Sequence, residues 1–348
     1  MSDIDIRITG RAGRITLTRS KALNALSYDM CMAVDAALKA WADDDAVDLV
    51  VMDAEGEKAF CAGGDIAELY QTGTSGDYDY GRRFWRDEYR MNARIFEYPK
   101  PVVSFLQGFV MGGGVGLGCH GTHRIVGNNT KIAMPEVGIG LIPDVGGTLM
   151  LALAPGRLGE YLGLTGARMT AADAIYAGFA DHYIPETRWP TLIAELEHSG
   201  RTDQLADAAE TAPEGRLEAL RDTIDHSFAG ETLGAILTTL DQDGSAFADE
   251  TLKTLRRNAP LSMACTVELL HRLRLGTMGI RKALELEYRF THRAMDKGDF
   301  LEGIRAQIID KDRQPKWQYA DRDVPATAVS QMLMPLATQT LQFEEENT

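Results

Sequence analysis

The pattern of apolar and polar positions divides the chain into two zones. In the first zone, up to about residue 205, apolar and polar residues alternate in IRITG and GRITLTR, which predicts a hairpin around Gly10–Gly13. The segment SYDMCMAVDAALKAW has apolar residues at helical spacing behind Ser27, a residue type that caps helices. It therefore predicts a helix that runs to about Ala42.

The rest of the first zone continues with short elements. The apolar runs VDLVVMDA and PVVSFLQG predict buried strands, and HRIVGNNTKIAM (123–134) predicts a hairpin-like stretch. The rhythm of strand, strand and helix is neither a strict βαβ alternation nor an all-β pattern, so it indicates an α/β fold. Helices are predicted for 79–97, 159–164 and 171–177, the last capped by Thr170.

The second zone, from about residue 206, has less glycine and longer helical periodicities. Behind them, the tail after DKDRQPKW (310–317) predicts a loose helix and an acidic, frayed end, FEEENT. The sequence therefore predicts a core over residues 1–205 and a helical C-terminal region over 206–348. The helices predicted in this zone cover 214–228, 231–242, 245–258, 261–273 and 277–297.

Composition narrows the classes of partner. The chain has 348 residues and a formal net charge of −15, which argues against nucleic acid and anionic membranes as partners, because both need a basic face. A phosphorylated ligand remains compatible, since a few backbone N–H groups can hold it. No run of about 18 apolar residues occurs, the N-terminus lacks a signal or transit pattern, and the four cysteines form no CxxC pair. We therefore expect a reducing, cytoplasmic location.

Two glycine-rich sites each follow an apolar strand. They are AGGD, residues 62–65, and MGGGVGLG, residues 111–118. The first is compatible with a plain strand–helix turn, and the second with a close backbone approach or a tightly packed helix. Together they suggest two backbone N–H groups that converge as an oxyanion hole. Residues 116–121 also match G-x-G-x-x-G, but no acid follows at the expected distance, so a dinucleotide site is disfavoured.

A third glycine-rich stretch, MPEVGIGLIPDVGG (134–147), holds two acids eight positions apart in an otherwise apolar run. Burying a charge without a partner is costly, which favours a chemical role for Glu136 and Asp144. Glycines and prolines interrupt any helix here, so both acids can turn toward one cavity. The alternatives are an ordinary loop acid at Glu136 and a turn residue at Asp144.

Histidines and cysteines near these sites have simpler interpretations. His120 and His123 are three residues apart, but no third ligand is evident, so we read them as structural and expect no metal. Cys61 and Cys119 flank the proposed oxyanion loops, where small apolar packing is the favoured use.

The motifs AFCAGGDI, GFVMGGGVGLG, AMPEVGIGLIPDVGG and LTGARMTAADAIYAGFADHYIP occur in this order. Together they resemble the crotonase (enoyl-CoA hydratase/isomerase) superfamily. The C-terminal segments ETLGAILTTLDQDGSAFADETLKTLRRNAPLS and LELEYRFTHRAMDKGDFLEGIRAQIIDKDRQPKW resemble its 3-hydroxyisobutyryl-CoA hydrolase branch. The resemblance implies a crotonase-like spiral of ββα units, with C-terminal helices that cover the active site.

The same resemblance implies a role for each matching residue. The oxyanion donors would be the N–H groups of Gly64 and Gly113, and Glu136 would be the catalytic glutamate. Asp144 would be the hydrolase branch's second carboxylate, and Glu88 an acid of the substrate site. The positions implied for binding coenzyme A are Lys21, Ala22, Leu23, Ala62, Asp65 and Ile66.

One position separates the hydratase pattern from the hydrolase pattern. Hydratases of the superfamily position water between two glutamates, and the first of these falls where this chain has Gly116. We therefore expect hydrolysis of a short hydroxyacyl-CoA, above all 3-hydroxyisobutyryl-CoA of valine catabolism, with no cofactor besides the coenzyme A of the substrate. The alternatives are enoyl-CoA isomerisation or hydration and a non-catalytic CoA-binding module. A homo-oligomer is left open.

Overall fold

The computed structural model describes residues 3–276, 278–320 and 324–343. They form two compact units that are interleaved along the chain. We call residues 1–65, 90–133 and 168–218 the sheet unit, and residues 66–89, 134–167 and 219–348 the helical unit. The predicted boundary near residue 205 follows a change in composition and stays a prediction, whereas these units follow contacts in space.

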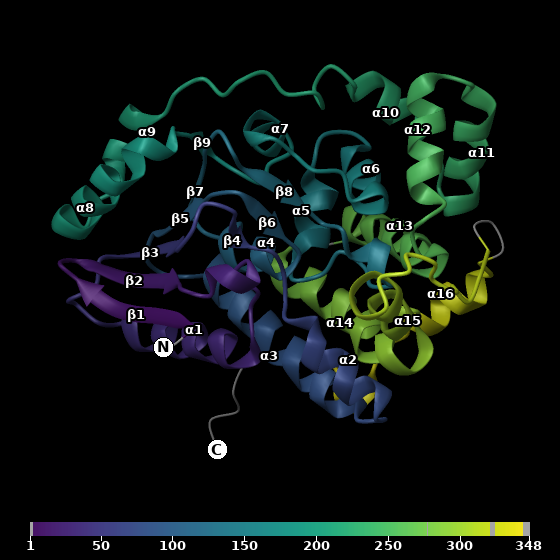
Figure 1. Ribbon diagram of the computed structural model, residues 1–348, viewed down its shortest axis with the longest axis horizontal. Helices are drawn as coiled ribbons and strands as arrows, with labels where there is room; N and C mark the ends of the chain where they lie inside the picture. Colours follow the sequence, from purple (N-terminus) through teal and green to yellow (C-terminus); the bar gives the residue numbers. More distant parts are fainter. Residues whose placement is uncertain (1–2, 277, 321–323, 344–348) are drawn as a thin grey trace. The chain divides into compact units, whose positions relative to one another are not determined.

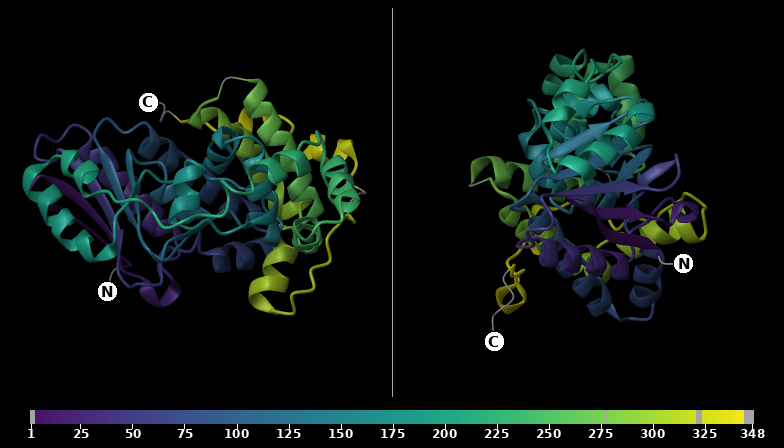
Figure 2. Two further views of the ribbon diagram at one scale, coloured as in Figure 1. Left: turned by 90° about the horizontal axis from the view of Figure 1, so that it is seen from above. Right: turned by 90° about the vertical axis from the view of Figure 1, so that its left-hand side faces the viewer.

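A six-stranded sheet forms the centre of the sheet unit, in the order β1-β2-β3-β5-β7-β9. The strands β1 and β2 pair as the predicted antiparallel hairpin, and every other neighbouring pair is parallel. Figure 2 shows the purple and blue strands of this sheet lying side by side. The strands are β1 (Ile4–Thr9), β2 (Ala12–Leu17), β3 (Leu49–Ala54), β5 (Val102–Leu106), β7 (His123–Val126) and β9 (His182–Tyr183).

A second sheet has three parallel strands in the order β4-β6-β8, which are β4 (Ala59–Cys61), β6 (Phe109–Met111) and β8 (Lys131–Ala133). The predicted hairpin over 123–134 is wrong, because β7 and β8 belong to different sheets. The segment between them crosses from one sheet to the other. The Thr130 hydroxyl secures this crossing, since it accepts the Gly127 N–H at 2.9 Å and donates to the Leu106 carbonyl at 2.6 Å.

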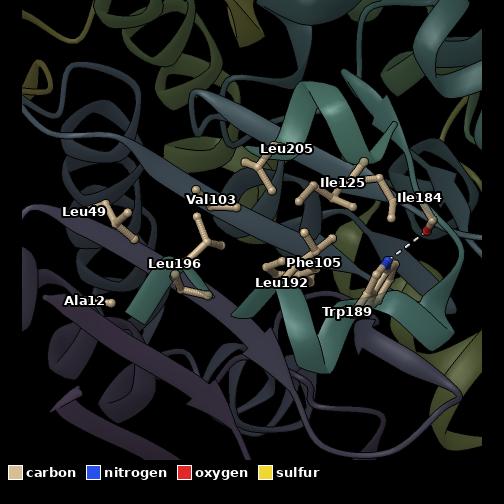
Figure 3. Packing of buried hydrophobic residues seen from close by; sticks show 12 residues of the cluster. Ala12, Leu49, Val103, Phe105, Ile125, Ile184, Trp189, Leu192, Leu196 and Leu205 are labelled. Atoms are coloured by element: carbon tan, nitrogen blue, oxygen red, sulfur yellow. Dashed lines mark hydrogen bonds between the residues drawn. The ribbon is translucent and has the colours of Figure 1, made fainter. Parts of the chain in front are cut away.

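Helices pack against both faces of the large sheet. Residues of α8 (Trp189–Ser199) and α9 (Asp203–Ala208) pack on one face, where the indole N–H of Trp189 donates to the Ile184 carbonyl at 2.8 Å (Figure 3). Trp41, at the end of α1 (Tyr28–Trp41), contacts Gly13, whose side-chain position points away from that of Ala12. Figure 1 accordingly shows α1 and α8 on opposite sides of the strands.

The predicted caps are confirmed. The Ser27 side chain accepts the Met30 N–H at the start of α1. Thr170 caps α7 (Ala171–Tyr176) in a reciprocal capping box with Asp173. The short helix α4 (Gly113–Gly118) follows β6 and has no side-chain cap among the described residues.

The helical unit contains most of the remaining helices. The predicted helix over 214–228 is shorter than expected, because α10 begins only at Arg221. The helices are α2 (Ile66–Thr74), the first part of α3 (Tyr78–Phe96), α5 (Gly147–Leu153), α6 (Leu158–Thr165), α10 (Arg221–Ser227), α11 (Leu233–Asp243), α12 (Ala246–Leu255), α13 (Pro260–Leu275), α14 (Ile280–Lys297), α15 (Phe300–Ile304) and α16 (Ala326–Met332).

The end of the chain is described only in part. Helix α16 matches the predicted helix of the tail, and the acidic end FEEENT lies outside the described residues except for Phe343. None of the described helices has both the length and the apolar character needed to cross a bilayer.

Candidate active site

The two predicted oxyanion loops lie at neighbouring strand ends of the sheet unit. Gly64 follows β4 and Gly113 follows β6, and these strands pair in parallel, so both loops leave the same edge of the small sheet. Gly63 adopts a φ of 115°, a conformation that favours glycine. Within the described residues, neither the Gly64 N–H nor the Gly113 N–H has a hydrogen-bond acceptor. The two donors are therefore free to bind a ligand oxygen.

All but one of the predicted CoA-binding residues lie in the sheet unit. The Ala62 N–H donates to the Leu23 carbonyl at 3.1 Å, and the Asp65 N–H donates to the Leu26 carbonyl at 2.8 Å. Lys21 and Ala22 lie exposed in a single 3-10 turn, where a ligand can reach them. Ile66 begins α2 in the helical unit.

The run of glycines in the second loop has a steric cause. A Cβ atom on Gly114 would lie 2.1 Å from the Cys61 carbonyl oxygen, so α4 and β4 approach too closely for any side chain. We expect Gly114→Ala to destabilise the protein by about 1–3 kcal/mol, as overpacking does. Gly234→Ala is the matched control, because its nearest neighbour is 4.0 Å away and α11 gains a better helix former. Urea unfolding would measure both, and an unchanged midpoint for Gly114→Ala would refute the contact.

The two acids of the third glycine-rich stretch belong to the helical unit. Glu136 begins a short 3-10 turn (Glu136–Ile139), which ends at Gly140 with a φ of 77°. Glu136 is 5% exposed and Asp144 is 4% exposed. The helix break that the sequence predicts is confirmed, and both carboxyls lie buried as their cost suggested.

Glu88, the third predicted acid, is buried in the same cluster. It lies on α3 one residue before Tyr89, whose hydroxyl donates to Asp144 Oδ2 at 2.7 Å. Among the described residues, Glu88 Oε1 and Glu136 Oε2 have no hydrogen-bond partner. Two unpartnered carboxylate oxygens in the interior are acceptors that a substrate or a water molecule could use.

Burial raises the pKa of every acid in this cluster, and like charge adds to it for Glu136 and Glu88. Burial is the main cause for Glu136 and Glu88, whose pKa values lie well above the usual range, and the Asp144 charge raises both further. Burial also raises the pKa of Asp144 to about 7, against the effect of the Tyr89 hydrogen bond. Acids with such pKa values can exchange protons near neutral pH.

Sequence reasoning missed a fourth acid, Glu287 on α14. It is fully buried, and burial raises its pKa to about 8, although three hydrogen bonds from Gly146 and Thr148 lower it. The sequence did contain a signal for Glu287. One face of the predicted helix carries Ile280, Leu284, Glu287 and Thr291, so the glutamate occupies a position of the buried face.

The raised pKa values of these acids predict that the free energy of unfolding falls as pH rises. Unfolded carboxyls have pKa values of about 4, so the native state holds more protons than the unfolded state up to about pH 8. Between pH 7 and pH 9 Asp144 and Glu287 ionise in the folded protein, and we expect a loss of at least about 1 kcal/mol in urea unfolding. The loss should be smaller in Asp144→Asn, and equal stability at both pH values would contradict the assignment.

The remaining candidates of the sequence have packing contacts. His120 lies edge-on to Phe96 at 5.9 Å, and His123 stacks on His182 at 6.2 Å. Burial raises the pKa of the Cys119 thiol to about 12, so it stays neutral and is a poor nucleophile. Throughout the described residues, no group of three His, Cys, Asp or Glu side chains has an arrangement that could hold a metal ion.

Comparison with known proteins places the chain in a family. The sequence profile described as enoyl-CoA hydratase/isomerase matches residues 12–333, which is nearly the whole chain. The chain belongs to the enoyl-CoA hydratase/isomerase family. Its mixed α/β fold is the crotonase fold, as predicted.

Relatives within the enoyl-CoA hydratase/isomerase family carry different names. The chain is 38% identical to the 3-hydroxyisobutyryl-CoA hydrolase, mitochondrial, of Gallus gallus, over 92% of this chain and 85% of that protein. It is 37% identical to the probable 3-hydroxyisobutyryl-CoA hydrolase 3 of Arabidopsis thaliana, over 87% and 84%. A solved enoyl-CoA hydratase from Rhodobacter sphaeroides is 57% identical with a TM-score of 0.94, covering 98% of this chain and 100% of that one.

Proposed function

We propose that this protein hydrolyses the thioester of a short hydroxyacyl-CoA, 3-hydroxyisobutyryl-CoA above all, to the free hydroxy acid and CoA. The observation that carries the proposal is the buried carboxyl cluster of Glu136, Asp144 and Glu88, whose pKa values burial raises, with the Asp144 charge raising those of Glu136 and Glu88 further. The hydrolase names of the relatives from Gallus gallus and Arabidopsis thaliana support it. A place in valine catabolism is part of the same proposal.

In this mechanism the Gly64 and Gly113 N–H groups bind the thioester oxygen as it gains negative charge. Such a donor contributes roughly 3–4 kcal/mol to an acyl transfer. Lys21 to Leu23, together with Ala62, Asp65 and Ile66, are proposed to bind the CoA portion. The two free N–H groups of the sheet unit support these roles, since both lie at the same sheet edge.

Glu136 promotes attack on the carbonyl carbon in one of two ways. As a nucleophile it forms a mixed anhydride while the C–S bond breaks, and water then cleaves the anhydride. As a general base it removes a proton from the attacking water. Ionising one of Glu136 and Asp144 disfavours ionising the other, so the pair is expected to share a proton near neutral pH. Asp144 can then give a proton to the leaving thiolate or orient the substrate hydroxyl, and Glu88 can accept that hydroxyl.

Enoyl-CoA hydration is the second candidate, because the 57% identical structure from Rhodobacter sphaeroides carries the name of a hydratase. A solved protein from Mycobacterium thermoresistibile, 39% identical over 99% of this chain and 100% of that one with a TM-score of 0.94, is named a carnitinyl-CoA dehydratase. Gly116, on α4, opposes hydration in this chain, because glycine has no carboxyl group where hydratases of the superfamily have the first of their two glutamates.

A panel of acyl-CoA esters tests the proposal. Thiol release should be fast with short hydroxyacyl-CoA esters and at least about 100-fold slower with the same acyl chain lacking the hydroxyl, because a site built to bind a hydroxyl leaves polar groups unpaired without it. Loss of an enoyl-CoA without thiol release would favour hydration. Binding of every ester without turnover would favour a CoA-binding module.

Location and assembly belong to the proposal only as expectations. The cytoplasmic location expected from the sequence stays a prediction, and the relative from Gallus gallus is named as mitochondrial. A homo-oligomer and the absence of a further cofactor likewise stay predictions.

A further inference from the structure

The Asp144 turn, residues 144–148, has an unusual backbone. Val145 has a φ of 54° and Gly146 a φ of 84°. Positive φ is natural for glycine but unfavourable for a β-branched residue such as valine. The Gly147 N–H donates to the Asp144 carbonyl at 2.7 Å, which closes the turn on itself. A strained turn persists only where its surroundings hold it.

Glu287 holds the turn from α14. Its Oε2 accepts the Gly146 N–H at 2.8 Å, and its Oε1 accepts the Thr148 N–H at 3.0 Å as well as the Thr148 hydroxyl. One carboxyl thus binds the backbone on both sides of Gly147. The three bonds fix both the position and the orientation of the segment that begins with Asp144.

A second set of contacts reaches the Asp144 side chain from the same helix. The Tyr89 hydroxyl, which donates to Asp144 Oδ2, lies 3.4 Å from Thr291 Oγ1. Thr291 is one helical turn after Glu287, whose carbonyl oxygen lies 3.5 Å from the same hydroxyl. Helix α14 therefore supports Asp144 in two ways. Glu287 holds the backbone of the Asp144 turn, and Thr291 contacts the tyrosine that binds the Asp144 carboxyl.

We propose that Glu287 is a positioning residue of the hydrolytic site, which holds the Asp144 turn and thereby places the Asp144 carboxyl, with Tyr89 as the second support. This inference rests on the proposed function, because it assigns Asp144 a part in the reaction. Glu287 itself acts through the turn and not on the substrate.

A purely structural role would suit a different residue. The helical unit contains another fully buried acid, Glu160, which pairs with Arg157 and Arg274 as a buried carboxylate ordinarily does. The described hydrogen bonds of the Glu287 carboxyl come instead from peptide N–H groups and a hydroxyl, and the charge raises the pKa of Glu136. Packing alone does not explain why Glu287 lies close to two other buried acids, Asp144 and Glu136.

Three substitutions and one control test the positioning role by kinetics with a hydroxyacyl-CoA ester. Glu287→Gln places an amide N–H₂ against a backbone donor and should lower kcat about 100-fold with KM nearly unchanged, as small displacements of a reacting group do. Thr148→Val removes only the hydroxyl and should lower kcat about 10-fold, whereas Thr148→Ser should keep it. Glu160→Gln should lower the melting temperature but leave kcat unchanged.

The pH profile adds a readout that a structural defect would not move. Asp144, Glu136 and Tyr89 are the titratable groups that Glu287 influences. Because the Glu287 pKa is about 8, its charge acts at the alkaline end of the kcat profile, and removing it in Glu287→Gln should move the profile there, whereas Glu160→Gln should leave it in place. A folded Glu287→Gln or Thr148→Val protein with wild-type kcat and wild-type pH profile would overturn the proposal.

Carboxyl NMR separates this inference from the proposed function. If the wild-type protein hydrolyses no hydroxyacyl-CoA, the proposed function fails, but the Asp144 titration can still be followed in protein labelled with ¹³C at the aspartate carboxyls. Asp144→Asn assigns the signal. We expect its titration to shift in Glu287→Gln and not in Glu160→Gln, and an unchanged titration in Glu287→Gln would show that Glu287 does not position Asp144.

Discussion

Replacing Glu136 by glutamine is expected to lower thioester hydrolysis by at least about 1,000-fold, because the amide is neither a base nor a useful nucleophile. The fold should not suffer. Glu136 Oε2 is buried without a partner among the described residues, and burial raises the Glu136 pKa, so the carboxyl costs stability when it is ionised. Activity and stability should therefore change in opposite directions.

Thiol release and urea unfolding, measured on the same preparation, check this expectation. Near wild-type turnover in Glu136→Gln would remove Glu136 from the mechanism. An inactive protein that is also unfolded would identify Glu136 as a structural residue. A single turnover in ¹⁸O-water then tests the anhydride route, since label in the Glu136 carboxyl and an unlabelled product acid require the anhydride, whereas a labelled product acid can come from either route.

Asp144→Asn is expected to have the second largest effect, a loss of about 100-fold to 10,000-fold in kcat, which is the range of general acid–base catalysis. Asparagine keeps an oxygen that can accept the Tyr89 hydroxyl, so the turn should keep its shape. It removes the charge that raises the pKa of Glu136 and of Glu88, so the pH profile should move as well as fall.

Tyr89→Phe provides the comparison for Asp144→Asn. It leaves the Asp144 carboxyl in place and removes its 2.7 Å hydrogen bond, which lowers the Asp144 pKa. Its effect on kcat should be smaller than that of Asp144→Asn. If Asp144→Asn leaves kcat within about twofold of the wild type, Asp144 is only the turn residue that the sequence also allowed.

Local signals made part of the fold predictable. The N-terminal hairpin and the caps at Ser27 and Thr170 depend on neighbouring residues, and all three are confirmed. The segment from His123 to Ala133 misled because its glycine and two asparagines are typical of a hairpin turn, while its strands pair with partners far away in the chain. The start of α10 was displaced for a similar reason, since the Arg216 and Leu217 N–H groups donate to the distant Asp173 carboxyl.

Local signals also made part of the candidate site predictable. Glu136, Asp144 and the glycine loops were found because charge or glycine is unexpected in their local sequence. Glu287 lies in LELEYRF, where a second acid, Glu285, makes a solvated helix face plausible. Only the spacing of the buried residues along the helix distinguishes Glu287 from Glu285. The backbone contacts of Glu287 with Gly146 and Thr148 span about 140 residues of sequence and leave no local signal.

The interleaving of the two units limits how the gene can be shortened. The helical unit takes residues 66–89 and 134–167 from the first half of the chain and residues 219–348 from the second half. A chain that stops near residue 218 would keep Glu88, Glu136 and Asp144 but lose α14 and the carboxyl that holds the Asp144 turn. Under the proposed function, the acids and their support must be kept together, and the C-terminal helices then belong to the catalytic apparatus.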